Sequence, residues 1–171
     1  MNKILSLFFL LLIGNSSFAD NFIVTTNADS GTGSLRDAIT MANANGSIVT
    51  DNIHFNIPDN SIAGRTIILL SVYPDLTSKI IIDGSTQPGA FIGVSHAKIR
   101  ITNPAGVGVE CVFRIINSNN VEIYGFHFDK LNIVMGTYMS RTAILLNTTQ
   151  HITVGGAGRG NYFTNISYAV G

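Results

Sequence analysis

The sequence has little charge, a single cysteine and no tryptophan. Charged residues make up 12% of the 171 residues, and the ten basic and ten acidic side chains cancel, whereas typical domains are about 25% charged. Lys and Arg form no run or cluster, so the electrostatic footprint of a nucleic-acid-binding protein is missing. The same lack of basic clusters makes an anionic membrane surface a poor partner.

The lone Cys111 excludes a framework of internal disulfides. Stability must therefore come from packing and backbone pairing, and we interpret the thiol as a small buried hydrophobic group. The four histidines are scattered along the chain without the spacing of metal ligands. We therefore predict no metal site and no cofactor.

The first residues read as a targeting segment. Lys3 supplies a positive start, residues 4–13 form an apolar run, and small residues precede Asp20 as at a cleavage site. A run of about ten residues forms about 15 Å of helix, half of the roughly 30 Å hydrocarbon thickness, which argues against a membrane anchor. We expect residues 1–19 to be removed during export and the mature chain, beginning at Asp20, not to insert into a membrane.

Short runs of β-branched and apolar residues recur along the rest of the chain. Each run is bounded by Gly, Asn, Pro, Ser or Thr, which is typical of many short strands joined by turns. The runs lie at 22–26, 52–57, 66–70, 79–84, 98–102, 111–116, 121–128, 143–147 and 152–156. Because no linker divides them, the sequence predicts one all-β domain.

A five-residue pattern occurs three times. Its first and third residues are apolar, its second and fourth vary, and its fifth is glycine. The copies end at Gly84, Gly125 and Gly156, at spacings of 41 and 31 residues, and similar strands at 113–117 and 144–147 precede the last two. A repeated strand-and-turn unit favours a β-solenoid, in which equivalent strands stack in register, over the alternative of a β-sandwich. Asn residues at equivalent turns of such a stack can form hydrogen-bonded ladders.

The strand alternation changes at Gly125. Val121 and Ile123 share one parity, whereas Phe126 and Phe128 have the other. A one-residue bend at Gly125 returns both rings to the core, and glycine is the residue that tolerates such a bend.

One short segment has helical periodicity. Ser34 is the expected N-cap with Asp37 at N3, a variant of the capping box. Leu35 and Ile39 lie on one apolar face together with two alanines. Such a helix can cover the open first coil of a solenoid. We therefore predict that the structural cap consists of Ser34, Leu35, Asp37 and Ile39. The alternative is that the helix is presented to a partner.

These elements predict three regions in the chain. Residues 1–19 are the signal peptide, and residues 20–65 form an N-terminal capping strand and helix. Residues 66–171 form the parallel coils, which we expect to continue beyond the chain end, because no second cap is visible there.

The stretch FIVTTNADSGTGSLRDAITMANAN, at 22–45, resembles the N-terminal segment of large bacterial exported proteins that carry a Ser-Leu-Arg-acid-Ala-Ile motif. Similar pieces lie at 55–58, 82–89, 119–126 and 158–163. The resemblance implies a right-handed parallel β-helix of the pectate-lyase-like kind, with a capping helix over 35–44 and a secreted or bacterial cell-surface location. In many relatives a Cys precedes the serine of the motif, whereas this chain has Gly33 there.

Few side chains suggest chemistry. His127 and Asp129 lie two residues apart on a predicted strand and hence on one face, where Tyr124 can join them in a shallow surface site. Asp83 and Glu122 occupy comparable places in two repeat copies, but the third copy has no acid there, so a row of catalytic carboxylates is poorly supported. We therefore predict no catalytic residue, and we take Tyr124, His127 and Asp129 as binding candidates.

The sequence thus predicts an exported or cell-surface β-helix protein with a non-catalytic structural, adhesive or glycan-binding role. Its expected partners are surface glycans or other cell-surface components, contacted through exposed Asn, Thr and Tyr side chains. The alternative is the N-terminal part of a polysaccharide lyase or glycoside hydrolase whose active coils lie further along the chain.

Overall fold

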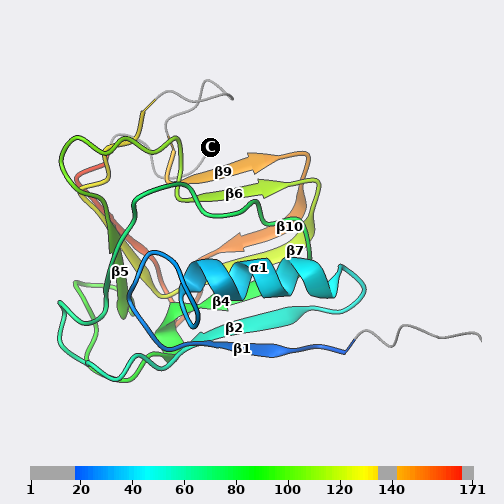
Figure 1. Cartoon of the computed structure of the whole chain (residues 1–171), viewed down its shortest axis with the longest axis horizontal. Helices are drawn as coiled ribbons and strands as arrows, with labels where there is room; N and C mark the ends of the chain where they lie inside the picture. The colour runs from blue at the N-terminus through cyan, green and yellow to red at the C-terminus, as the bar shows by residue number, and fades with distance from the viewer. Residues whose placement is uncertain (1–17, 135–141, 167–171) are drawn as a thin grey trace, which may run out of the picture.

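A computed structural model describes residues 18–134 and 142–166. Within them the chain winds into a parallel β-solenoid of about four turns, as Figure 1 shows. Residues 1–17 of the expected signal segment lie outside the described residues, and so do residues 167–171 of the expected coils.

The described strands form three sheets, which we name A, B and C. Sheet A contains β1 (Asn21–Val24), β2 (Asp51–Phe55), β4 (Ile80–Asp83), β7 (Asn119–Tyr124) and β10 (Gln150–Val154). Sheet B contains β3 (Thr66–Ile68), β5 (Ile99–Thr102), β8 (Phe126–Asp129) and β11 (Tyr162–Thr164). Sheet C pairs β6 (Phe113–Ile116) with β9 (Ile144–Asn147) and is extended by a parallel bridge from Leu76 to Ile115.

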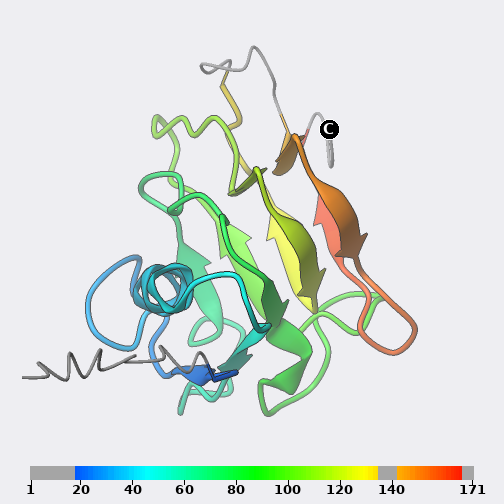
Figure 2. The ribbon, with the colours of Figure 1, turned by 90° about the vertical axis from the view of Figure 1, so that its right-hand side faces the viewer.

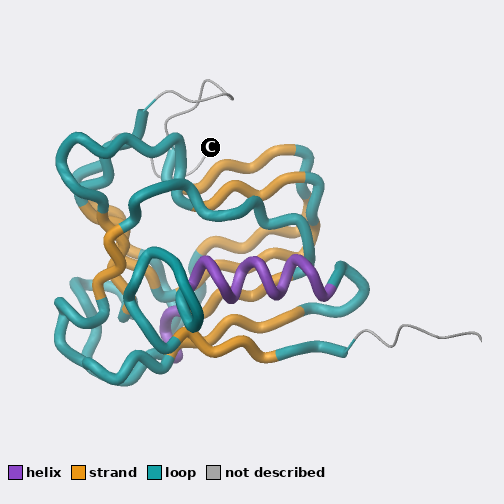
Figure 3. Tube along the Cα trace, viewed as in Figure 1, coloured by secondary structure: helices purple, strands orange, loops and turns teal. Residues whose placement is uncertain are grey.

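From β4 onward, successive strands of the chain belong to successive sheets. After β4 in sheet A come β5 in sheet B and β6 in sheet C, and the next coil repeats the order with β7, β8 and β9. Every strand pair among the described residues is parallel. Figure 3 shows the strands on separate sides of the molecule with loops between them. The solenoid prediction is confirmed, and the β-sandwich is wrong, because its sheets are built from antiparallel strands.

The core consists of apolar columns that run through the stacked coils. In sheet A the strand register joins Phe22, Ile53, Ile82, Ile123 and Val154. In sheet B the equivalent column is Ile67, Ile101, Phe128 and Phe163, where the two rings stack at 4.9 Å. Each coil thus places its apolar residues directly on those of its neighbours, and burial of this surface is the main stabilising contribution.

The predicted repeat matches the observed register. Ile82 lies opposite Ile123, and Ile123 lies opposite Val154, so the three copies of the pattern stack in sheet A. The bend also falls at the expected glycine. Gly125 has a φ of 74°, and the inward-facing residues before and after the bend, Ile123 and Phe126, are fully buried.

The sequence does not predict the short strand β11, because this strand follows a glycine-rich loop and has too few residues to show an alternation. The Asn ladder that equivalent turns can form is not present between the β6–β7 and β9–β10 turns, because Asn147 lies opposite Ile116. The turn position of Asn117, with a φ of 50°, is taken in the next coil by Thr148, with a φ of 54°.

Helix α1 (Leu35–Asn45) begins where the sequence predicts. The Ser34 hydroxyl accepts a hydrogen bond from the Asp37 amide at 3.2 Å, and the Asp37 carboxylate accepts one from Gly33 at 3.0 Å. This differs from the usual reciprocal box, in which the acid reaches the N-cap amide itself. The buried face consists of Leu35, Ala38, Ile39 and Ala42, so the predicted apolar face is confirmed.

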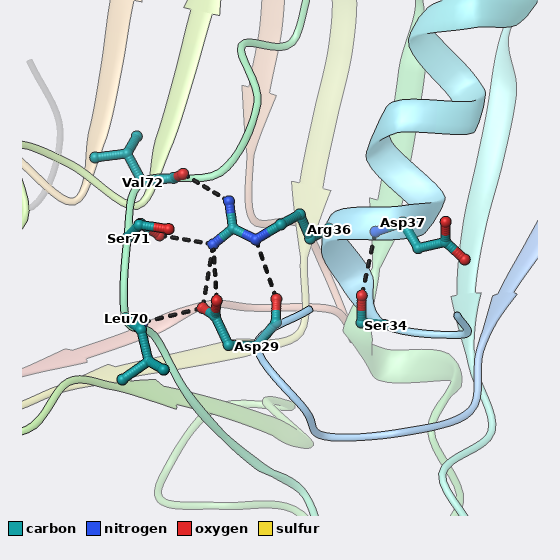
Figure 4. A network of polar contacts seen from close by, with 7 residues as sticks. All are labelled: Asp29, Ser34, Arg36, Asp37, Leu70, Ser71 and Val72. Carbon is teal, nitrogen blue, oxygen red and sulfur yellow. Dashed lines mark hydrogen bonds and ion pairs between the residues drawn. The ribbon is translucent and has the colours of Figure 1, made fainter. Parts of the chain in front are cut away.

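The helix lies along the open side of residues 70–77, the first segment to reach sheet C. Near its start, the Arg36 guanidinium donates hydrogen bonds to the carbonyls of Ser71 (2.8 Å) and Val72 (2.7 Å), as Figure 4 shows. Near its end, Asn43 donates to the Asp75 carbonyl at 2.7 Å and accepts from the Thr77 amide at 3.1 Å. Helix side chains therefore satisfy backbone groups that a neighbouring strand would otherwise bond, which caps this edge.

Candidate functional site

The structure divides the three predicted binding residues between two places. His127 and Asp129 lie on β8, on the outer face of sheet B, because the alternate residues Phe126 and Phe128 point into the core. Tyr124 lies at the end of β7 in sheet A, before the bend at Gly125.

Asp129 is the centre of the group on sheet B. Its carboxylate pairs with Arg100 and accepts hydrogen bonds from the Thr164 hydroxyl at 2.7 Å and the Asn165 amide at 2.9 Å. Burial alone would raise the pKa of Asp129, but these hydrogen bonds and the charge of Arg100 outweigh it, so the pKa lies below its ordinary value. Asp129 is therefore ionised at neutral pH, and its charge is matched by Arg100.

His127 is fixed by the same group. Its Nε2 lies 2.7 Å from the Thr164 hydroxyl, and that hydroxyl gives its proton to Asp129. We therefore assign the imidazole proton to Nε2. Burial lowers the pKa of His127, and its Nδ1 is buried without a partner among the described residues. Neither ring nitrogen is therefore both exposed to solvent and free of a partner. His127 is thus not positioned to act as a general base.

Aromatic rings border this ionic group. The Tyr162 ring stacks on His127 with 4.7 Å between centroids. The loop over residues 89–97 lies against the same tyrosine, since a Cβ atom on Gly93 would stand 2.6 Å from its ring. On this loop Phe91 is 55% exposed and Val94 is 91% exposed.

Two further basic groups accompany the loop. The His96 ring packs edge-on against Phe91 at 4.7 Å, and the Lys98 ammonium lies 5.7 Å from the centre of the Phe91 ring. Lys98 directly precedes β5, which carries Arg100. We name as the sheet B face the set Phe91, Lys98, Arg100, His127, Asp129, Tyr162 and Thr164.

The sheet B face combines flat apolar surfaces with fixed hydrogen-bonding groups. An exposed aromatic ring offers a stacking surface at little entropic cost, while a cationic group such as Lys98 can donate hydrogen bonds to oxygen atoms beside it. A sugar ring has the complementary chemistry, with apolar C–H faces and hydroxyls around its rim.

Tyr124 belongs to a closed cluster rather than to an open site. Its hydroxyl donates to Glu122 at 2.6 Å, and the Arg159 guanidinium lies 3.7 Å above its ring. Arg159 also pairs with Asp83 at 3.2 Å. Tyr124 is only 4% exposed, and burial together with the Glu122 hydrogen bond raises its pKa. The expectation that Tyr124 joins His127 and Asp129 in an exposed site is not met, because the loop carrying Arg159 covers it.

The same cluster accounts for the two carboxylates considered from the repeat. Asp83 lies opposite Tyr124, and Glu122 lies opposite Ile81. Asp83 accepts from the Ser85 amide at 2.9 Å as well as pairing with Arg159, and Glu122 holds the Tyr124 hydroxyl. Asp83 thus holds the β10–β11 loop to sheet A, and Glu122 fixes the tyrosine ring on which Arg159 lies.

Within residues 18–134 and 142–166, no three His, Cys, Asp or Glu side chains gather as metal ligands would. No helix in that part of the chain has the length and hydrophobicity needed to span a bilayer. The buried Cys111 thiol has a pKa raised by burial to about 12, which makes it a poor nucleophile.

The fold and these two clusters define a parallel β-helix with an ionic and aromatic outer face. Comparison with protein-family models, curated proteins and solved structures gives no match. The resemblance to bacterial exported β-helix proteins therefore stays a prediction.

Proposed function

We propose that this protein is an exported or cell-surface β-helix protein that binds glycans without chemical conversion, and that the sheet B face is its contact surface. The observation that supports this most is the exposure of Phe91 and Val94 on a loop packed against Tyr162. Exposed apolar groups gathered beside fixed polar groups are typical of binding surfaces.

The state of the ionisable groups also supports binding over catalysis. Asp129 is paired with Arg100, and His127 has one nitrogen bonded to Thr164 and the other buried. Hydrolysis of glycosides requires a carboxylic acid of raised pKa beside a second free carboxylate. The pKa of Asp129 is shifted in the opposite direction.

A glycan array probed with the purified, labelled protein tests the proposal. Bound glycans would then be titrated against Phe91→Ala, which removes an exposed ring and leaves the fold intact. We expect about a tenfold loss of affinity, in line with the energy of one aromatic contact.

The matched control is Ile48→Ala, which removes a side chain that is 73% exposed and lies outside the sheet B face. It should leave affinity unchanged. Equal affinities for Phe91→Ala and the unaltered protein would contradict the proposal, and release of shortened glycan fragments would favour a polysaccharide-degrading enzyme instead.

A further inference from the structure

A polar pocket lies at the corner where sheet C runs into sheet A. Its volume is about 300 Å³, at the small end of the range for ligand pockets. The corner lies at the right-hand end of β6 in Figure 1, away from β5 of sheet B, and faces the viewer in Figure 2. The pocket is lined by Ser47, Thr77, Lys79, Asn117, Ser118 and Asn119.

Three segments that are far apart in the sequence build the walls. They are the loop that follows α1, the turn that precedes β4 and the turn that joins β6 to β7. The corner is held by hydrogen bonds from the Ser118 hydroxyl to the Ser78 carbonyl at 2.8 Å and from the Ser78 hydroxyl to the Ala42 carbonyl at 3.2 Å. The walls are therefore formed before any ligand arrives.

Some lining groups are already used by the fold, and others are not. The Thr77 hydroxyl bonds Asn43, and the Ser118 hydroxyl bonds Ser78. The hydroxyl of Ser47 and the side-chain amide of Asn117 have no hydrogen-bond partner among the described residues. The Lys79 ammonium makes one long bond, 3.4 Å to the Ile48 carbonyl, and keeps its other donors.

The charge of the pocket is positive. Lys79 is the one charged side chain among the lining residues, and no carboxylate lines the pocket. Asp51, which pairs with Ile80 next to Lys79, is fully buried, and its Oδ1 accepts hydrogen bonds from the Asp20 amide and the Asn45 side chain. A small positive pocket rich in N–H and O–H donors selects a ligand with several anionic oxygens.

We propose that this pocket binds a sulfate or phosphate ester group, with Lys79 as its counter-ion and Asn117 and Ser47 as hydrogen-bond donors. A tetrahedral group accepts single hydrogen bonds from several directions, which matches donors that converge from three segments. A planar carboxylate is better matched by the fork of an arginine, and arginine does not line the pocket. This site is separate from the sheet B face, and the inference holds whether or not that face binds glycans.

Nuclear magnetic resonance titration of the isotope-labelled protein tests the site directly. The probes are inorganic sulfate, inorganic phosphate, glucose 6-sulfate and glucose 6-phosphate, with acetate and glucose as comparisons. We expect saturable shifts of the backbone amides of Ser47, Lys79 and Asn117 with the tetrahedral anions, weakening as salt is raised. Tighter binding of the sugar esters than of the inorganic ions would identify an ester as the ligand, and equal binding would identify the free ion.

Two variants give the control. Lys79→Gln keeps the length of the side chain and removes its charge, and it should weaken binding at least tenfold. Lys130→Gln makes the same change at an exposed lysine outside both the pocket and the sheet B face and should leave binding unchanged. Asn117→Gly keeps the turn, whose φ of 50° suits glycine, and should also weaken binding.

Three results would overturn the proposal. They are shifts with acetate or glucose as large as those with sulfate, binding that survives Lys79→Gln, and shifts that centre on His127 and Tyr162. Because thermal unfolding of each variant is measured alongside, a loss of binding caused by unfolding is separated from the loss of a ligand contact. Phe91→Ala, the variant that tests the sheet B face, should not affect this pocket.

Discussion

The Arg36 Nη1 atom donates a hydrogen bond to the backbone carbonyl of Val72 at 2.7 Å, which joins the first turn of α1 to the first full coil. The same guanidinium bonds the Ser71 carbonyl and both carboxylate oxygens of Asp29, and it lies 4.9 Å from the centre of the Tyr73 ring. Asp29 in turn accepts a hydrogen bond from the Leu70 amide at 3.0 Å (Figure 4). One side chain and its acidic partner thus connect the helix to four consecutive residues of the coil.

Substitution of Arg36 by Lys should therefore destabilise the protein although the charge is kept. A lysine ammonium cannot reach the Asp29, Ser71 and Val72 oxygens together, because it lacks the planar fork. We expect a loss of about 2 kcal/mol in the free energy of unfolding, measured by urea denaturation. The control is Met41→Lys, at a side chain of the same helix that is 42% exposed, and it should cost under about 0.5 kcal/mol. Equal midpoints for the two variants would contradict the role of Arg36.

Gly125→Ala should be more harmful than the same change at another left-handed glycine. A Cβ atom at Gly125 would stand 2.1 Å from the Ser85 backbone nitrogen, whereas at Gly106, where φ is 87°, nothing lies within 4 Å. Gly106→Ala should thus lower the free energy of unfolding by about 1 kcal/mol, the cost of a left-handed backbone conformation in a residue that has a Cβ atom. Gly125→Ala should cost at least about 2 kcal/mol more, because neighbouring coils must move apart. Similar melting temperatures for the two variants would show that the close stacking at this corner is not required.

Asp129→Asn should change how stability depends on pH. The pKa of Asp129 is lowered from its ordinary value of 3.8, so the ionised group stabilises the folded state above about pH 3.8, and this contribution is lost as pH falls through the lowered pKa. The unaltered protein should therefore be more stable than the variant at pH 7, with a gap that narrows at lower pH. Chemical denaturation from pH 7 to pH 2 measures this, and parallel curves would count against it.

The Cys111 thiol should report opening of the coil that contains it. It is fully buried, and its pKa is raised to about 12. At pH 8 a disulfide reagent should therefore modify the native protein at a rate limited by opening of the structure, and modify it within seconds to minutes in denaturant. A labelling rate in native buffer that equals the rate in denaturant would show that this part of the core is accessible.

The sequence predicted the architecture well where the pattern is local and repeated. Gly84, Gly125 and Gly156 mark equivalent positions in the coils, and Ser34 with Asp37 marks the helix start, because each signal lies within a few residues. The role of Arg36 was not predicted, since its partners Ser71 and Val72 lie 35 and 36 residues away in a segment without periodicity.

The site was predicted only in part for the same reason. Alternation along one strand placed His127 and Asp129 on the outer face. Their partners Arg100 and Thr164 lie 29 and 35 residues from Asp129, in neighbouring coils whose register depends on loops of irregular length. The alternation along β7 places Tyr124 on the outer face, as the sequence predicts. Alternation along a strand does not reveal, however, that a distant loop folds back over this residue.

The apolar columns also have a consequence for how the molecule comes apart. Each coil touches only the coils above and below it, so a disturbance is passed along a single axis and weakens with each coil it crosses. At one end, α1 holds the strand edge through Arg36 and Asn43. Loss of structure should therefore pass from coil to coil, and the amides around Leu76, which adjoin the contacts of Arg36 and Asn43, should be among the last to exchange.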